Sequence, residues 1–167
     1  GSVGISDVAE ALGVTRQTVY RYYATTDELL DAAATQAVLD LETQLVAHVR
    51  RVLGADGDAG DVVVEIVAFV HEHLRDDPAL DRLLAPGRIG VTLSGITAPT
   101  SIALGRQWLE GFGVDWAAAG VDDDGLRELV EHLLRILQSL VLDPGDPERS
   151  GPELRAYLQR WVAPALR

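Results

Sequence analysis

Residues 5–28 read ISDVAEALGVTRQTVYRYYATTDE, and this stretch decides how the chain is interpreted. Apolar residues between Val8 and Leu12 share one face of a short helix, and Gly13 ends that helix because glycine adopts a left-handed conformation at low steric cost. Thr15 then stands where a hydroxyl side chain can cap a second helix. Two short helices joined by a tight turn that contains glycine form a helix-turn-helix, whose second helix enters the major groove of DNA.

The two short helices need small and apolar residues where they meet. Ala9 stands four residues before Gly13, where a small side chain allows the helices to cross closely. Val14 and Val19 are expected to carry the apolar contacts that lock the second helix onto the first. The polar and aromatic residues of the second helix are then left for contacts with DNA.

The composition of the 167 residues is that of one globular domain with a small appendage. No apolar run approaches the ~18 residues that cross a membrane, and no charged-then-apolar leader is present, so we expect a cytoplasmic protein. The absence of cysteine excludes disulfides, thiol catalysis and zinc fingers. The chain starts at Gly1-Ser2 without methionine, and we expect it to be incomplete at its N-terminus.

The net charge of −12 opposes DNA binding as a property of the whole molecule, because phosphate neutralisation supplies most nonspecific affinity. In residues 5–23, Arg16 and Arg21 balance Asp7 and Glu10, and the acidic excess lies downstream. With a Debye length of about 8 Å at physiological salt, distant acidic groups weaken local phosphate contacts little. We therefore expect DNA affinity to depend on specific contacts.

Downstream of the motif the apolar residues follow helical spacing, and the chain is predicted to be all-α, with a small head and a larger bundle. Residues 88–97 are rich in β-branched side chains and remain open between a strand and a loop or helix start. Helix caps are expected from Thr26 or Asp27, from Asp61, and from Asp122 or Asp124. The helices after the motif are expected near residues 26–53, 61–75, 78–85, 99–112, 125–142 and 154–162.

Catalytic and metal-binding patterns are not found in the sequence. His71 and His73 are two residues apart, so on a helix they point about 200° away from each other and cannot hold one ion. The acidic run Asp122–Asp124 lacks the spacing of a calcium-binding loop. We therefore predict no catalytic residues, no metal and no cofactor.

Residues 7–30 resemble the tetracycline-repressor (TetR) family of transcriptional regulators, through DVAEALGV, Thr15, TVY at 18–20, the pair Tyr22-Tyr23 and DELL at 27–30. The resemblance implies a DNA-binding domain at residues 1–28, without its first helix here, and an effector-binding and dimerisation domain at residues 29–167. It also implies a homodimer, a repressor released from a palindromic operator by a small, largely apolar effector, and no enzymatic activity.

The resemblance assigns DNA contacts to residues of the second helix and its flanks. Arg16 and Gln17 suit guanine and adenine edges respectively, and Tyr20 suits the backbone or a thymine methyl group. Packing within the head is the alternative for Tyr20, and a purely capping function is the alternative for Thr15. The full set of expected DNA contacts is Thr15, Arg16, Gln17, Thr18, Tyr20, Arg21, Tyr22 and Thr26.

Two further sets of residues are expected in the bundle. Effector candidates are mostly aromatic, with one cation as a possible anion partner, although core packing is the alternative for each: Phe69, His73, Arg106, Trp108, Phe112 and Trp116. The last two long helices are expected to form the dimer interface through Leu126, Val130, Leu133, Leu137, Leu140, Leu154, Tyr157, Leu158 and Trp161. The competing hypotheses are an all-α small-molecule-binding protein and a dimeric scaffold, both without DNA binding.

Overall fold

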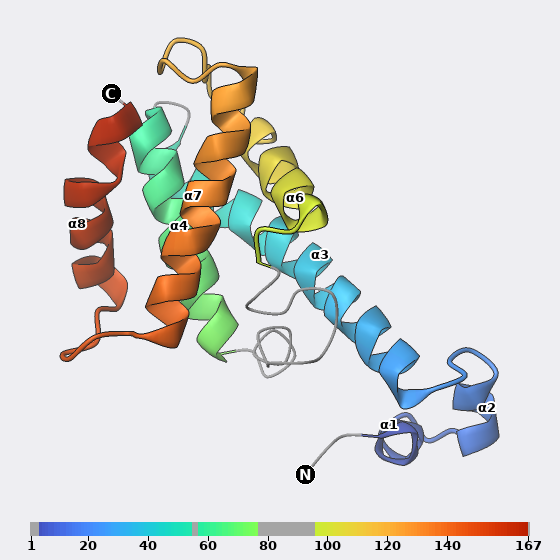
Figure 1. Ribbon diagram of the computed structural model, residues 1–167. Helices are drawn as coiled ribbons and strands as arrows, with labels where there is room; N and C mark the ends of the chain where they lie inside the picture. Colours follow the sequence, from blue (N-terminus) through green and yellow to red (C-terminus); the bar gives the residue numbers. More distant parts are fainter. Residues whose placement is uncertain (1–3, 55–56, 77–95, 167) are drawn as a thin grey trace. The chain divides into compact units, whose positions relative to one another are not determined.

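The computed structural model describes residues 4–54, 57–76 and 96–166, and all regular structure in these ranges is helical (Figure 1). The all-α prediction is therefore confirmed. The predicted helix at 78–85 and most of the ambiguous stretch 88–97 lie outside the described residues. The elements are α1 (Ile5–Ala11), α2 (Arg16–Tyr20), α3 (Thr26–Leu53), α4 (Ala59–Asp76), α6 (Pro99–Glu110), α7 (Asp123–Leu142), α8 (Gly151–Trp161) and the 3₁₀ helix η2 (Ala163–Leu166).

The chain divides into two compact units, Gly1–Leu39 and Asp40–Arg167. Helix α3 is continuous from Thr26 to Leu53, so it contributes residues to both units. The expected functional division between residues 28 and 29 concerns DNA and effector binding, and it stays a prediction.

The N-terminal unit has a small core formed by Ile5, Ala9 and Val19, on which Tyr23 and Leu29 pack. The small Ala9 is thus buried at the crossing of α1 and α2, as the sequence predicts. Gly13 adopts φ 65°, the left-handed conformation that the turn requires. Each of these residues contributes to one local structure, in which two short helices cross at a tight turn.

Two apolar residues of the motif are not in this core, against expectation. Leu12 is 67% exposed and Val14 is 40% exposed. Val14 lies in the turn, where its backbone N–H donates to the Ala9 carbonyl at 3.0 Å, while α2 turns only Val19 toward α1. The contact between the two helices therefore depends on Val19, and the part assigned to Val14 is wrong.

The caps of three helices are partly as predicted. Thr15 caps α2 by accepting a hydrogen bond from the Thr18 N–H at 3.2 Å. Thr25, rather than Thr26 or Asp27, caps α3, because its Oγ1 accepts from the Glu28 N–H at 3.1 Å. Likewise Asp58, rather than Asp61, caps α4, which begins two residues earlier than expected, at Ala59.

Helix α4 is the centre of the C-terminal unit. Every residue from Val62 to Val70 is buried, and α4 contacts α7, α8 and η2 (Figure 1). Helix α6 packs on α7 so closely that a Cβ atom at Gly105 would lie 2.6 Å from Val130 Cγ1. Asp122 caps α7 by accepting from the Gly125 N–H at 2.8 Å, as one of the two expected alternatives. This bundle positions the residues for which effector binding and dimerisation are predicted.

Candidate DNA-binding, effector and dimer sites

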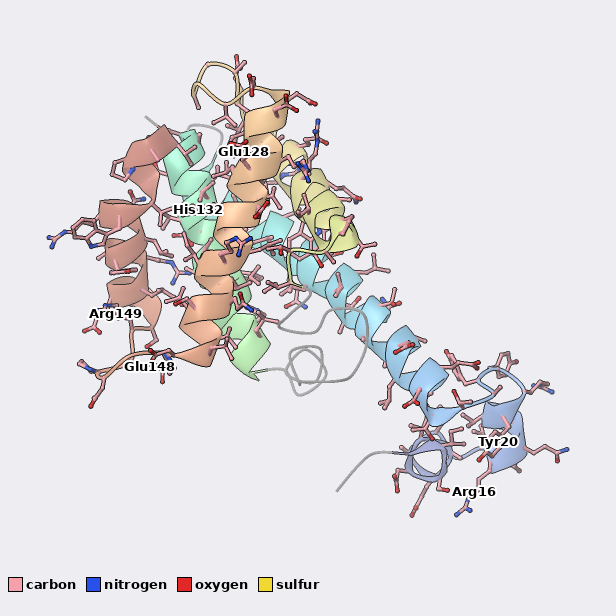
Figure 2. The ribbon with its side chains drawn as sticks, viewed as in Figure 1. Arg16, Tyr20, Glu128, His132, Glu148 and Arg149 are labelled. Carbon is pink, nitrogen blue, oxygen red and sulfur yellow. The ribbon has the colours of Figure 1, made fainter. Side chains whose placement is uncertain are left out.

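Helix α2 carries its candidate DNA contacts on the side that is not packed on α1. Of its five residues, Val19 alone is buried, whereas Arg16, Gln17 and Tyr20 are exposed (Figure 2). Tyr20 is 54% exposed, so packing within the head does not account for its side chain. The short helix therefore presents a cation, an amide and a phenol together to solvent.

The flanking candidates also lie at the surface of this unit. Thr15 and Thr18 share a hydrogen bond between their hydroxyl groups at 3.0 Å, in addition to the cap. The Arg21 guanidinium lies 5.1 Å from the Tyr22 ring centroid and donates to the Tyr22 hydroxyl at 3.3 Å. Thr26 is half-buried at the first position of α3. The predicted contacts are thus gathered within two helices and their joining segments.

The effector candidates fall into two separate groups in the bundle. Phe69 is buried on α4, between the rings of His48 at 4.7 Å and His73 at 3.8 Å. Because a carbonyl only accepts, His73 Nδ1 donates to the Phe69 carbonyl at 2.9 Å. The other candidates lie on α6 and in the segment that leads to α7. The candidates are therefore divided between α4 and the region of α6.

Arg106 has partners that the sequence analysis did not foresee. Its Nε donates to Glu110 at 2.8 Å, and its terminal nitrogen donates to the Asp123 carboxylate. The hydrogen bonds to Asp123 and Glu110 raise the pKa of Arg106 above its ordinary value. Two carboxylates therefore already neutralise its charge, and the contact of Arg106 with an anionic effector stays a prediction.

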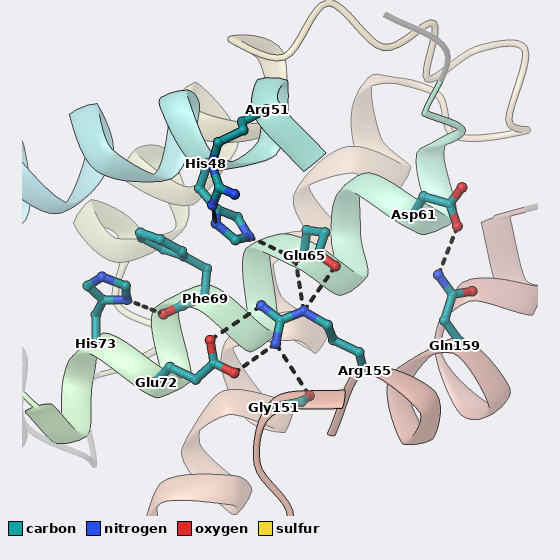
Figure 3. A network of polar contacts seen from close by, with 10 residues as sticks. All are labelled: His48, Arg51, Asp61, Glu65, Phe69, Glu72, His73, Gly151, Arg155 and Gln159. Atoms are coloured by element: carbon teal, nitrogen blue, oxygen red, sulfur yellow. Dashed lines mark hydrogen bonds and ion pairs between the residues drawn. The ribbon is translucent and has the colours of Figure 1, made fainter. Parts of the chain in front are cut away.

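A network of charged residues joins α3, α4 and α8 in the interior of the bundle (Figure 3). Arg155 of α8 donates from Nε to both carboxylate oxygens of Glu65 at 3.0 Å and from Nη1 to Glu72 at 2.7 Å. Glu65 also accepts from His48 Nε2 of α3 at 2.9 Å. Sequence reasoning missed this network, since residues 65 and 155 are 90 positions apart.

The protonation states in the network follow from its donors. Arg51 donates to His48 Nδ1 at 3.0 Å, so this nitrogen carries a lone pair, and Nε2 carries the proton that is donated to Glu65. Burial raises the pKa of Glu72, but the hydrogen bonds and the charge of Arg155 outweigh burial and hold this pKa below its ordinary value. Glu72 therefore stays ionised beside the guanidinium that it shares with Glu65.

The dimer candidates separate into buried and exposed residues. The buried ones pack within the chain, and their contact with a partner subunit stays a prediction: Leu126, Val130, Leu133, Leu137, Leu154 and Leu158. Leu140 is half-buried, and Tyr157 and Trp161 are exposed on α8. Arg149 lies 4.8 Å from the Tyr157 ring centroid. A partner could therefore reach these three of the candidates.

The described residues contain neither a metal-binding group nor a membrane-spanning helix. Among the described residues, no three His, Cys, Asp or Glu side chains form a group that could hold a metal ion. Of the helices in the described ranges, none is sufficiently long and apolar to span a membrane.

Comparisons with known proteins agree with the geometry of the N-terminal unit. Residues 1–33 match the family described as "Bacterial regulatory proteins, tetR family". Two curated proteins, from two strains of Mycobacterium tuberculosis, are named uncharacterized HTH-type transcriptional regulators and are each 24% identical over 167 residues, which are 99% of this chain and 76% of each relative. No solved structure matches the chain significantly. The helix-turn-helix of α1 and α2 thus lies within the residues that match the TetR family, and both relatives carry the name of HTH-type transcriptional regulators.

Proposed function

We propose that this regulator is a homodimeric repressor that leaves a palindromic operator when a small, largely apolar effector binds its helical bundle. The observation that carries the proposal is the exposed face of α2. Arg16, Gln17 and Tyr20 are exposed there while Val19 fixes the helix to α1. A rigid short helix with exposed Arg and Gln side chains is suited to reading base edges in a major groove.

The eight predicted DNA contacts are proposed to divide into two kinds. Arg16 and Gln17 read bases, because their side chains offer the bidentate groups that suit guanine and adenine. Tyr20 contacts the backbone or a thymine methyl group. The remaining residues bind the DNA backbone and thereby position α2: Thr15, Thr18, Arg21, Tyr22 and Thr26.

Dimerisation is proposed to use the outer faces of α7 and α8. Leu140, Tyr157 and Trp161 are accessible, and Trp161 is 69% exposed. Large aromatic side chains at this exposure are typical of protein interfaces. A dimer would place two copies of α2 in successive major grooves about one helical turn, ~34 Å, apart. The operator is accordingly expected to be a near-palindrome.

The effector is proposed to act by favouring one of two arrangements of the dimer. A ligand shifts such an equilibrium only by its difference in affinity for the two states. The bundle supports this proposal through its aromatic candidates Phe69, His73, Trp108, Phe112 and Trp116, whereas Arg106 is already paired. Phe69 and His73 already stack on each other within α4, so we assign the effector to the candidates of α6 and of the segment after it.

The proposal is tested by selecting genomic fragments with the full-length protein and footprinting the selected DNA. We expect one protected near-palindrome. The double variant Arg16→Ala/Gln17→Ala should bind it at least tenfold more weakly, since each bidentate base contact contributes about 1–3 kcal/mol of discrimination. Arg50→Ala removes a cation from an exposed position of α3 outside the motif and should change affinity much less.

Two results would refute parts of the proposal. If no fragment is selected, or if the double variant and the control bind alike, the DNA-reading face is misplaced. If Trp161→Ala and Tyr157→Ala together leave the dimer unchanged in sedimentation, the proposed interface is wrong. Both residues are exposed, so their removal is not expected to unfold the bundle.

A further inference from the structure

Helix α6 and the segment after it contain buried hydrogen-bond donors that lack acceptors. Among the described residues, Ser101 Oγ, Trp108 Nε1 and Trp116 Nε1 are inaccessible to solvent and have no hydrogen-bond partner. Trp116 as a whole is only 8% exposed. Leaving such a buried group without a partner costs about 1–3 kcal/mol, so each one needs an explanation. A bound molecule with acceptor atoms would provide one.

The donors on α6 point in one common direction. Ser101 and Trp108 are seven residues apart, so their directions differ by only about 20° in a helix of 3.6 residues per turn. Gly105 faces α7 at Val130, and Gln107 faces α3, where its Nε2 donates to Glu42 at 3.5 Å. The direction of Ser101 and Trp108 falls between these two, on the face of α6 that is turned toward the interior of the bundle.

The remaining donor lies close to the same end of α6 along the chain. Trp108 occupies the last turns of α6, and Trp116 follows in the segment that returns to α7. This segment is folded back on itself, because the Val121 N–H donates to the Trp116 carbonyl at 2.8 Å. The two indole N–H groups thus belong to one end of the α6–α7 pair, with Ser101 about 10 Å along the helix from Trp108.

The charges of α6 favour a neutral ligand over an anionic one. Arg106 is the cation of α6, and it is directed to Glu110 and to Asp123 at the start of α7. Phe112 follows two residues after the end of α6 and adds an apolar ring near Trp108 in the sequence. The face therefore offers donors and apolar surface, with no unpaired positive charge.

We infer that the inward face of α6, with Trp116, binds a neutral, largely apolar molecule whose carbonyl or ether oxygens accept hydrogen bonds from Trp108, Trp116 and Ser101. The inference rests on the proposed effector function, for which it names the chemical class of the effector. It adds Ser101 to the site and replaces the anion contact expected of Arg106 by hydrogen bonds from neutral donors.

The inference is tested by NMR of the full protein with isotope-labelled tryptophan, which gives separate indole N–H signals for Trp108, Trp116 and Trp161. The probes are benzylacetone, which has a carbonyl group, and butylbenzene, a hydrocarbon of similar size. Benzylacetone should move the Trp108 and Trp116 signals downfield in a saturable manner.

Variants separate hydrogen bonding from packing. Ser101→Ala removes a donor with little loss of volume. It should weaken benzylacetone binding about fivefold to tenfold, the equivalent of one hydrogen bond, without changing the binding of butylbenzene. Trp108→Phe removes a donor together with part of the ring, so it should weaken benzylacetone binding more than it weakens butylbenzene binding. Thr100→Ala removes a hydroxyl group from an exposed position of α6. It is the matched control for Ser101→Ala and should change neither. Far-ultraviolet circular dichroism verifies that each variant is folded.

Three outcomes would overturn the inference. The Trp108 and Trp116 signals could already have the downfield position of hydrogen-bonded indoles in the free protein, benzylacetone could leave both unmoved, or butylbenzene could shift them equally. Operator binding is measured on the same preparations. If the protein binds its operator in any of these cases, the proposed function stands and only the effector class is wrong. If the wild-type protein does not bind an operator although benzylacetone moves both signals, the proposed function alone is wrong.

Discussion

Replacing Arg155 by methionine should destabilise the bundle by about 3 kcal/mol. Arg155 is the shared partner of Glu65 and Glu72, and its Nε lies 3.0 Å from Glu65. Glu65 is only 7% exposed, so the substitution leaves a buried carboxylate without its cation. Removing one partner of a buried ion pair costs about 3–5 kcal/mol. We expect the lower end of this range, because the side chains of Arg155 and Glu72 are 24% and 27% exposed and His48 still donates to Glu65.

Urea unfolding followed by circular dichroism at neutral pH measures this effect. Arg160→Met on the same helix is the matched control, and it should cost no more than about 0.5 kcal/mol because Arg160 is exposed. Adding Glu65→Gln and Glu72→Gln to Arg155→Met should recover at least half of the loss, since no buried charge then lacks a partner.

Two results would refute this reasoning. If Arg155→Met costs no more than Arg160→Met, the network does not stabilise the fold. If neutralising the two glutamates brings no recovery, the loss comes from packing of the arginine stem instead of from unpaired charge.

Other predictions concern single contacts of the bundle. The folded-state pKa of Glu72 is lowered from 4.5, so its pairing stabilises the protein fully above pH 4.5, and this stabilisation is lost as the pH falls through the folded-state pKa. The difference in unfolding free energy between wild type and Glu72→Gln, measured by urea titration, should therefore shrink below pH 4.5. A difference that stays constant with pH would contradict this assignment. Asp122→Ala should lower the free energy of unfolding by about 1 kcal/mol, because it removes the N-terminal cap of α7. Asp124→Ala, at the alternative cap position, should lower it less. Equal losses of stability in urea unfolding would contradict the assignment of the cap to Asp122. Gly105→Ala should destabilise the protein by about 1–3 kcal/mol in thermal unfolding, because the added methyl group overpacks against Val130. Val130→Ala in the same chain should restore part of this stability. If the two losses of stability are additive, the two positions are not in steric contact.

Local sequence patterns were sufficient for the helix-turn-helix and for most helices. Gly13, Thr15 and Val19 act within a few residues of their partners, so their spacing alone predicts the turn, the cap and the contact. The bounds of α3 were also predicted, because helical periodicity is a local property that a long amphipathic helix repeats many times. Caps were less certain, since neighbouring Thr and Asp residues are chemically equivalent and only the backbone decides between Thr25 and Thr26.

The sequence by itself determined that the chain is all-α and begins with a segment similar to the TetR family, because these properties depend on spacing over a few turns. Only the tertiary structure decided which apolar residues of α7 and α8 are buried within the chain, since a sequence shows how wide an apolar face is but not which part of it a neighbouring helix covers. It also decided that Arg155 meets Glu65 and Glu72, and that Arg106 is paired with Glu110 and Asp123. The pairs of Arg155 with Glu65 and of Arg106 with Asp123 join different helices, and such contacts exist only after the helices have packed.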